Sequence, residues 1–166
     1  MNTATQFVQF QGPVGVLEGL QDEPVDGAFK GIAVIAHPHP LFGGTMQNKV
    51  VQTLAKAFVQ NGWRAIRFNF RGVGASAGVY DEGRGELEDM LSVIAQSQSP
   101  ESKGLALAGF SFGAYVTSHA AAQLAPTEQL EKLVLVGTAA SRFQVAPVPP
   151  ELHDLSLIHI SEPTRH

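Results

Sequence analysis

Short apolar runs recur along the chain at intervals that predict strands alternating with helices. Gly31–Ala36 is continuously apolar, which is typical of a strand covered on both faces. Met46–Asn61 carries apolar residues at helical spacing and ends before Gly62, a common residue just beyond a helix. By the same reasoning we expect strands at Ala65–Phe70, Leu105–Ala108 and Leu133–Val136, and helices at Glu86–Ala95 and Phe112–Leu124.

The first apolar runs of the chain differ from the later ones because no helix separates them. Phe7–Phe10 and Val14–Leu20 are split by Gly12-Pro13, which predicts a hairpin at a sheet edge. The alternation that follows predicts an α/β fold, with a mainly parallel sheet, right-handed crossovers and helices on both faces. Chemistry in such sheets lies at the carboxyl ends of the strands, so we expect the functional residues just after residues 36, 70, 108 and 136.

Composition narrows the class of protein. The chain has 166 residues, of which 44% are hydrophobic and 16% charged, as expected for a single domain with a buried core. A net charge of −4 argues against nucleic acid or an anionic membrane as partner. The chain contains no cysteine, so neither a disulfide framework nor a thiolate zinc site can form. Residues 1–10 lack the features of a signal peptide, and we expect a cytoplasmic protein.

A G-x-S-x-G motif lies between the predicted strand at Leu105–Ala108 and the helix at Phe112–Leu124. This strand–turn–helix setting is the one that a nucleophile elbow requires, and it would expose the hydroxyl of Ser111 at the amino end of the helix. The helix dipole there favours a developing oxyanion. The alternative is a glycine-lined helix start at which Ser111 merely caps the helix.

The stretch HPHPLFGG at 37–44 follows the buried strand Gly31–Ala36. The two histidines could bind a metal, but alternate residues of an extended chain point in opposite directions and no acidic ligand is near in sequence. The other interpretation is an oxyanion-hole loop, which must direct a backbone N–H at the substrate oxygen. Proline has no N–H, so the possible donors are His37, His39 and Leu41.

Four motifs together, HPHPLFGG, FNFRGVGASAG, YDEGRGE and GFSFG, resemble a subfamily of α/β-hydrolases known only as hydrolases or esterases. The resemblance covers about residues 5 to 145. It implies that Ser111 is the nucleophile and that the backbone N–H groups of Phe112 and His39 form the oxyanion hole. It also implies that four residues of the loop after the second parallel strand shape the floor of the site: Arg71, Gly72, Gly74 and Ser76.

The segment Gly72–Ala77 also reads as G-x-G-x-x-A, the dinucleotide fingerprint. That fingerprint needs a helix that opens directly on its glycines, whereas here several turn-forming residues delay the helix until around Glu86. We therefore expect no nucleotide, no other cofactor and no metal. The acidic residues near this helix start are expected to be solvated or to cap the helix: Asp81, Glu82, Glu86 and Glu88.

The rest of a catalytic triad is missing from the expected place. In this fold the order is Ser, then Asp or Glu, then His, so both partners must follow Ser111. His119 lies on the helix that starts at the elbow, about 12 Å further along, and cannot reach the hydroxyl. His153 and Asp154 would precede the next strand and lie at its wrong end.

The last residues, 155–166, resemble the in-frame translation of a transposase-type sequencing adapter. The alternative is that Ser156–Ile160 is the family's seventh strand, where a run like Leu-Val-Ile-His-Gly-Glu-x-Asp is expected. The sequence departs from that pattern, with Ser161 at the Gly and Thr164 at the Asp. We therefore expect a partial α/β-hydrolase domain at 1–154, ending after about strand six, and a non-native tail at 155–166.

These observations lead to a functional hypothesis. The full-length protein is expected to be a serine hydrolase of a small-molecule ester or related acyl substrate, and the chain as given to be inactive. A thioesterase, amidase or peptidase on the same scaffold is an alternative, as is a non-catalytic binding or interaction protein with this fold. No lid is evident between 137 and 154, which favours a small, open pocket for short-chain substrates.

Overall fold

A seven-stranded sheet organises the molecule, with strand order β1-β2-β4-β3-β5-β6-β7. The computed structural model describes residues 5–24, 29–98, 103–124, 130–137 and 156–160, the last as backbone only. The strands are β1 (Gln6–Gly12), β2 (Gly15–Asp22), β3 (Gly31–Ala36), β4 (Trp63–Phe68), β5 (Leu105–Phe110), β6 (Leu130–Val136) and β7 (Ser156–Ile160).

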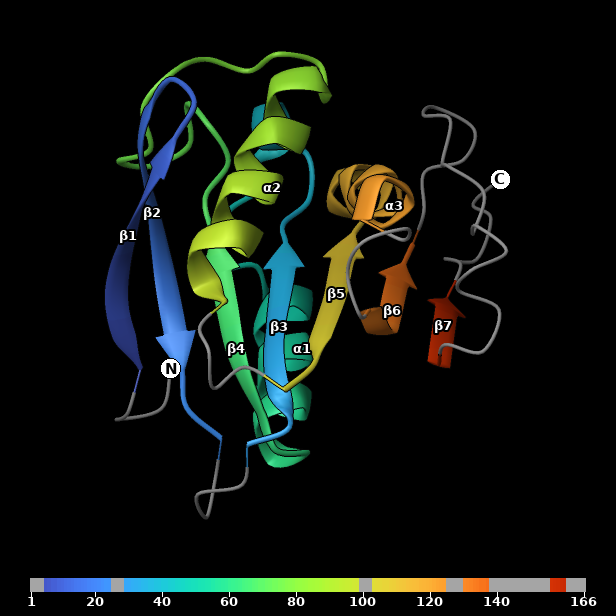
Figure 1. Cartoon of the computed structure of the whole chain (residues 1–166). Helices are drawn as coiled ribbons and strands as arrows, with labels where there is room; N and C mark the ends of the chain where they lie inside the picture. Colours follow the sequence, from blue (N-terminus) through green and yellow to red (C-terminus); the bar gives the residue numbers. More distant parts are fainter. Residues whose placement is uncertain (1–4, 25–28, 99–102, 125–129, 138–155, 161–166) are drawn as a thin grey trace.

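The first two strands form the antiparallel hairpin predicted at the sheet edge, with Gly12 opposite Gly15. β2 pairs antiparallel with β4, and all later pairs are parallel. The arrowheads of β3, β5 and β6 therefore point to one edge of the sheet (Figure 1). This confirms the α/β class and the mainly parallel sheet, and it brings the loops after these strands together.

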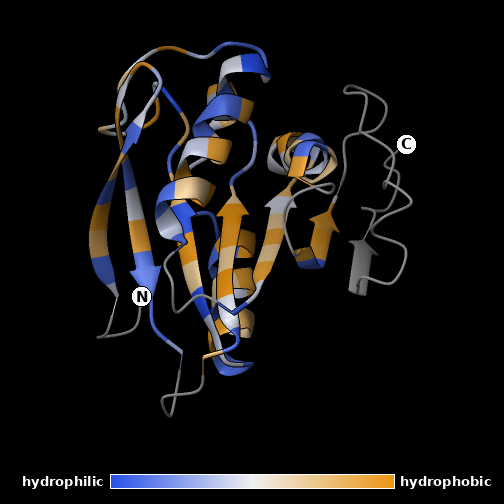
Figure 2. Ribbon diagram, in the orientation of Figure 1, coloured by the Kyte–Doolittle hydropathy of each residue, from blue (hydrophilic) through white to orange (hydrophobic). Residues whose placement is uncertain are grey.

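Helices cover both faces of the sheet. α2 (Arg84–Ser97) and α3 (Phe112–Leu124) lie on the near face in Figure 1, and α1 (Lys49–Gln60) lies behind the sheet. Apolar residues of β3 alternate between the two layers: Val34 packs in the core under α2 and α3, and Ile35 packs in the core under α1. This period of two explains why the strand is apolar throughout, as Figure 2 shows for the central strands.

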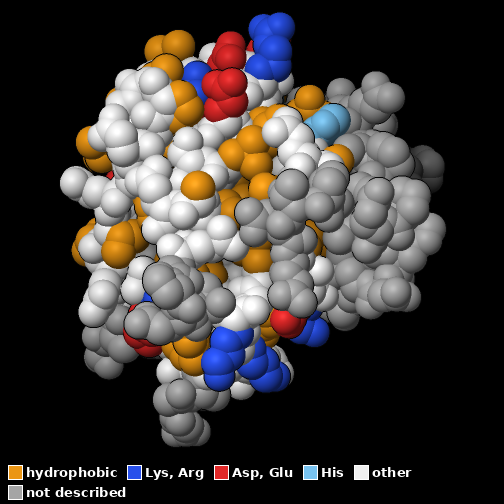
Figure 3. All heavy atoms as spheres, viewed as in Figure 1, with side chains coloured by type: hydrophobic (Ala, Val, Ile, Leu, Met, Phe, Trp, Pro, Cys, Tyr) orange, Lys and Arg blue, Asp and Glu red, His pale blue; other side chains and the backbone are white. Residues whose placement is uncertain are grey.

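On the near face, charged side chains gather toward the two ends of the strands (Figure 3). The middle of that face shows mainly apolar and uncharged atoms among the described residues. Within the part of the chain that the structure describes, no helix is long and apolar enough to cross a bilayer.

β4 starts and ends two residues earlier than the predicted strand at Ala65–Phe70. Trp63 opens it and is fully buried against Phe58 of α1, with ring centroids 6.1 Å apart. Asn69 and Phe70 lie beyond its end, because the backbone turns away there to make contacts with other loops.

The segment Ser156–Ile160, part of the tail expected to be non-native, pairs with β6 as a parallel seventh strand. The sheet therefore continues one strand beyond the expected end. Backbone pairing depends little on side-chain identity, and a segment containing Leu157, Ile158 and Ile160 suits an open sheet edge. Such pairing does not depend on where the sequence comes from, so the origin of residues 155–166 stays a prediction.

Candidate active site

Ser111 stands at the junction of β5 and α3 with a positive φ of 57°. Only one other non-glycine residue in the described part of the chain, Glu82, has a positive φ. An L-residue in the left-handed region is strained, and such strain persists only where the surroundings enforce it. Here the Ser111 N–H donates to the Val136 carbonyl at 2.9 Å, and the Ser111 carbonyl accepts the N–H of Ala114 at 2.9 Å. The backbone thus has the sharp strand-to-helix turn of a nucleophile elbow.

The two glycines of the motif are required by close backbone packing. A Cβ on Gly109 would lie 2.3 Å from the carbonyl oxygen of Gly113. A Cβ on Gly113 would lie 2.3 Å from the carbonyl oxygen of Ala36 and 2.6 Å from that of His37. The elbow is therefore packed directly against the end of β3, where the stretch 37–44 begins.

Phe112 is the first residue of α3, and its side chain is fully buried. Backbone N–H groups in the first turn of a helix point out of its amino end, and the helix dipole adds partial positive charge there. The N–H of Phe112 therefore belongs to the end of the helix that adjoins Ser111. This location is the one expected for an oxyanion donor.

His37 is fully buried at the end of β3, and both of its ring nitrogens are hydrogen-bonded. Its Nε2 accepts the backbone N–H of Phe70 at 3.0 Å, so the ring proton is on Nδ1 and is donated to the Pro38 carbonyl at 2.7 Å. Burial lowers the pKa of His37 from 6.5 to about 4, and the hydrogen bond to Pro38 opposes that shift. His37 is thus a neutral side chain that ties the 37–44 loop to the end of β4.

His39 has a different environment from His37, as expected for alternate residues. It precedes the short 3₁₀ helix η2 (Pro40–Phe42), and its Nδ1 accepts the Leu41 N–H at 3.1 Å. Its Nε2 lies 3.2 Å from the hydroxyl of Tyr80. Its ring centroid is 5.0 Å from that of Phe112. The structure therefore brings the loop of His39 to the start of α3, so that the two predicted oxyanion donors belong to adjacent segments.

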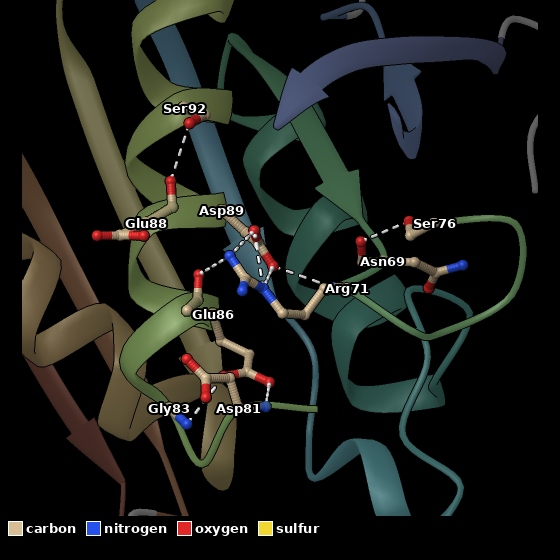
Figure 4. Close-up of polar contacts among 10 residues, drawn as sticks. Asn69, Arg71, Ser76, Asp81, Gly83, Glu86, Glu88, Asp89 and Ser92 are labelled. Atoms are coloured by element: carbon tan, nitrogen blue, oxygen red, sulfur yellow. Dashed lines mark hydrogen bonds and ion pairs between the residues drawn. The ribbon is translucent and has the colours of Figure 1, made fainter. Parts of the chain in front are cut away.

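Arg71 connects the loop after β4 to α2 (Figure 4). Its guanidinium pairs with the fully buried Asp89 at 2.9 Å and also donates to the Gly85 carbonyl at 2.9 Å. The backbone N–H of Arg71 also donates to the Asp89 carboxylate, at 3.0 Å. The hydrogen bonds and charge of Asp89 raise the pKa of Arg71. Neither Asp89 nor this pairing was evident from the sequence.

Ser76 and Asn69 hold the same loop to the edge of β2. The Ser76 hydroxyl donates to the Asn69 carbonyl at 2.8 Å and accepts the Glu18 N–H at 3.0 Å. The Asn69 amide donates to the Glu18 carboxylate at 2.9 Å, and its oxygen accepts the Met46 N–H at 2.8 Å. The roles of Asn69 and Glu18 were not predicted, because their partners are distant in sequence.

The glycine-rich segment forms a folded loop, with Gly72 and Gly74 at positive φ of 77° and 55°. The next helix does not open on these glycines but begins at Arg84, near the predicted start. Glu86 caps that helix: its two carboxylate oxygens accept the N–H groups of Asp81 and Gly83, each at 2.8 Å. Glu82 and Glu88 are exposed to solvent. The capping or solvated role expected for these carboxylates agrees with their positions.

The other ionisable candidates do not complete a triad within the described residues. The ring of His119 packs edge-on against that of Tyr115, with centroids 4.9 Å apart. His153 and Asp154 lie outside the described residues. No group of three or more His, Cys, Asp or Glu side chains suited to a metal ion occurs in the part that was described.

Fold and elbow together define a chain of the α/β serine hydrolase class, and comparison with known proteins places it in a family. Residues 29–158 match the family described as serine aminopeptidase, S33, and the chain belongs to that family. An uncharacterized protein of Rickettsia prowazekii is 40% identical over 111 residues, which are 66% of this chain and 46% of that protein.

Solved structures give the same class. An alpha-beta serine hydrolase homologue from Coxiella burnetii is 42% identical with a TM-score of 0.73, over 83% of this chain and 64% of that one. An α/β serine hydrolase without a lid from Xanthomonas campestris is 33% identical with a TM-score of 0.78, over 98% and 86% of the two chains. The chain thus spans less than half of the Rickettsia relative and under two thirds of the Coxiella one.

Proposed function

We propose that the full-length protein is a serine hydrolase that cleaves an ester or related acyl bond of a small molecule through an acyl-enzyme on Ser111. The observation that carries this proposal is the left-handed backbone of Ser111 at the strand-to-helix turn. A strained serine at the amino end of a helix presents its hydroxyl outward and close to N–H donors. Membership of a serine hydrolase family supports the same reading.

The proposed reaction has two stages. The Ser111 hydroxyl oxygen bonds to the acyl carbon, and its proton passes to a histidine that follows in the chain. The carbonyl oxygen becomes an oxyanion, which the N–H groups of Phe112 and His39 hold while the C–O bond to the leaving group breaks. The leaving alcohol takes the proton from the histidine. A water molecule then attacks the acyl-enzyme, transfers a proton to the histidine and releases the acid, while Ser111 regains its proton.

A peptidase is the second candidate, because the family is described as serine aminopeptidase. An aminopeptidase must recognise the free ammonium group of its substrate, for which a carboxylate is the usual partner. The two fully buried carboxylates beside the site have other partners: Asp89 pairs with Arg71, and Glu86 caps α2 (Figure 4). Among the described residues this favours an uncharged acyl substrate over a peptide amino terminus.

The test is labelling of the full-length protein with a fluorophosphonate probe. We expect one label per molecule, lost in Ser111→Ala and retained in Ser92→Ala, which changes a half-buried serine of α2. Faster turnover of p-nitrophenyl acetate than of leucine p-nitroanilide supports the ester substrate, and the reverse order supports the peptidase. A folded full-length protein that is not labelled would contradict the hydrolase and favour the binding protein.

The second part of the proposal concerns the chain of 166 residues itself. The described residues complete no triad with Ser111, and a serine hydroxyl without a general base is a poor nucleophile at neutral pH. We expect this chain to turn over p-nitrophenyl acetate at least about 1,000-fold more slowly than the full-length protein. Equal rates would show that the base lies within these residues.

A further inference from the structure

The motif YDEGRGE has no part in the reaction described above, yet its tyrosine lies at the site. Tyr80 is half-buried, with its ring centroid 5.1 Å from that of His39 and 5.8 Å from that of Phe112. Its hydroxyl is 3.2 Å from Nε2 of His39. Tyr80 therefore bridges the loop before α2 and the loop that carries the predicted oxyanion donor.

The direction of the hydrogen bond between Tyr80 and His39 follows from the other nitrogen of the ring. A backbone N–H can only donate, so Nδ1 of His39, which lies 3.1 Å from the Leu41 nitrogen, must be the acceptor. The ring proton is then on Nε2 and is donated to the Tyr80 oxygen. Both nitrogens of His39 are thus used, one to close the turn at Leu41 and the other to reach Tyr80.

Tyr80 is itself held in place from two sides. The next residues turn back onto α2, where Glu86 accepts the N–H groups of Asp81 and Gly83. On the other side, a Cβ on Gly72 would lie 3.4 Å from the Tyr80 nitrogen, so the two ends of the loop segment 72–80 pack against each other. The acceptor for His39 is therefore fixed by α2 and by the first residues of its own loop, which follows β4.

We propose that Tyr80 is a positioning residue. Its phenolic oxygen holds the imidazole of His39, so that the turn at His39–Leu41 directs the backbone N–H of His39 at the substrate oxygen. This inference rests on the proposed function, because it gives Tyr80 a role in the same oxyanion hole. Burial raises the pKa of Tyr80, so the phenol stays protonated and uncharged throughout the working pH range.

The test compares the two tyrosines of the chain in the full-length protein. Tyr80→Phe keeps the ring and removes the acceptor, and Tyr115→Phe makes the same change beside Phe112, where the ring centroids are 6.1 Å apart. We expect Tyr80→Phe to lower kcat for p-nitrophenyl acetate by about tenfold with KM unchanged, since a small misplacement of a donor acts on the transition state. Tyr115→Phe should change kcat less than about twofold, and both variants should stay folded, with Tm lowered by no more than a few degrees.

A double-mutant cycle tests whether Tyr80 acts through His39. His39→Phe keeps the backbone N–H but removes both ring nitrogens, so in that background Tyr80→Phe should have no further effect on kcat. Additive losses would overturn the proposal, as would a kcat of Tyr80→Phe equal to that of the wild type.

A measurement that needs no activity separates this inference from the proposed function. Amide exchange of Leu41 should be about tenfold faster in Tyr80→Phe than in wild type or in Tyr115→Phe, because the His39 ring that accepts this N–H is no longer held. Unchanged exchange would overturn the positioning role even if Ser111 reacts. Faster exchange in a protein whose Ser111 is unreactive would support the positioning role and contradict only the hydrolase.

Discussion

Two loops meet at the carboxyl edge of the sheet, and they are held in different ways. The elbow around Ser111 is fixed by the absence of side chains: Gly109 and Gly113 let backbone segments approach to distances at which a Cβ could not fit. The 37–44 loop is fixed by side chains that reach across the fold, with His37 bonded to the N–H of Phe70 and His39 to Tyr80. The elbow thus depends on the glycines of its own motif, and the 37–44 loop depends on the side chains it shares with distant residues.

This difference has consequences for both stability and function. Close backbone packing cannot adjust, so a change in the elbow should affect the whole fold. A loop held by hydrogen bonds can lose one bond and keep its fold while the position of its donor shifts. The following predictions test this contrast, in order of decreasing effect on the free energy of unfolding.

The largest effect is expected for Gly113→Ala. The new Cβ would lie 2.3 Å from the Ala36 oxygen and 2.6 Å from the His37 oxygen, both in rigid backbone. We expect the free energy of unfolding, measured with urea, to fall by about 4 kcal/mol or more, or the protein not to fold. The control is Gly43→Ala, which has a positive φ of 82° but no atom within 4 Å, and should cost about 1 kcal/mol. Similar losses in both variants would show that close packing does not specify the elbow.

The next effect is expected for Asp89→Ala, which leaves Arg71 buried without its carboxylate. Removing one partner of a buried pair costs about 3–5 kcal/mol, and we expect a loss in that range by urea unfolding. Glu82→Ala is the control, because its pair with Arg84 is long, at 3.9 Å, and both side chains are more than three-quarters exposed. A loss for Asp89→Ala as small as that of the control would contradict the anchoring role of the pair.

A pH-dependent effect is expected from His37. The folded protein binds a proton at His37 only near pH 4, whereas the unfolded chain binds it near pH 6.5. Stability contributed by neutral His37 is therefore fully present above pH 6.5 and is lost as the pH falls toward 4, by about 3 kcal/mol in total. His37→Phe should remove this part of the pH dependence while it lowers stability at pH 7 by about 1–3 kcal/mol. An unchanged slope between pH 6.5 and 4 in His37→Phe would contradict the assignment.

The smallest effect is expected for Ser76→Ala. Its buried hydroxyl donates to the Asn69 carbonyl and accepts the Glu18 N–H, and we expect a loss of about 1–2 kcal/mol in urea unfolding. Ser92→Ala removes an exposed hydroxyl that donates to the Glu88 carbonyl and should change stability by less than about 0.5 kcal/mol. Equal values would mean that Ser76 does not hold the loop after β4.

The same contrast explains how much could be predicted from the sequence. The helix Phe112–Leu124 and the strand Gly31–Ala36 have the predicted bounds, because their apolar pattern and flanking glycines are local signals. The elbow was predicted for the same reason. The strand that became β4 was predicted two residues too late along the chain. Asn69 and Phe70 were read as part of the strand, but they contact Met46 and His37 instead.

The support of the 37–44 loop could not be predicted. Alternation along an extended chain indicates that His37 and His39 face opposite ways, but it cannot name Phe70 and Tyr80 as their partners. Those partners are 33 and 41 residues away. A single sequence carries no signal for such pairs, and only the fold that places β3 beside β4 brings them into contact.

The central claim is that the elbow presents Ser111 as the nucleophile of an acyl transfer. The most direct measurement mixes the full-length protein rapidly with p-nitrophenyl acetate, quenches the reaction in acid and identifies modified peptides by mass spectrometry. We expect a transient acetyl group on Ser111 that forms during the initial burst of p-nitrophenol and is absent in Ser111→Ala. Steady turnover with the acetyl group on another residue, or with Ser111→Ala as active as the wild type, would contradict it.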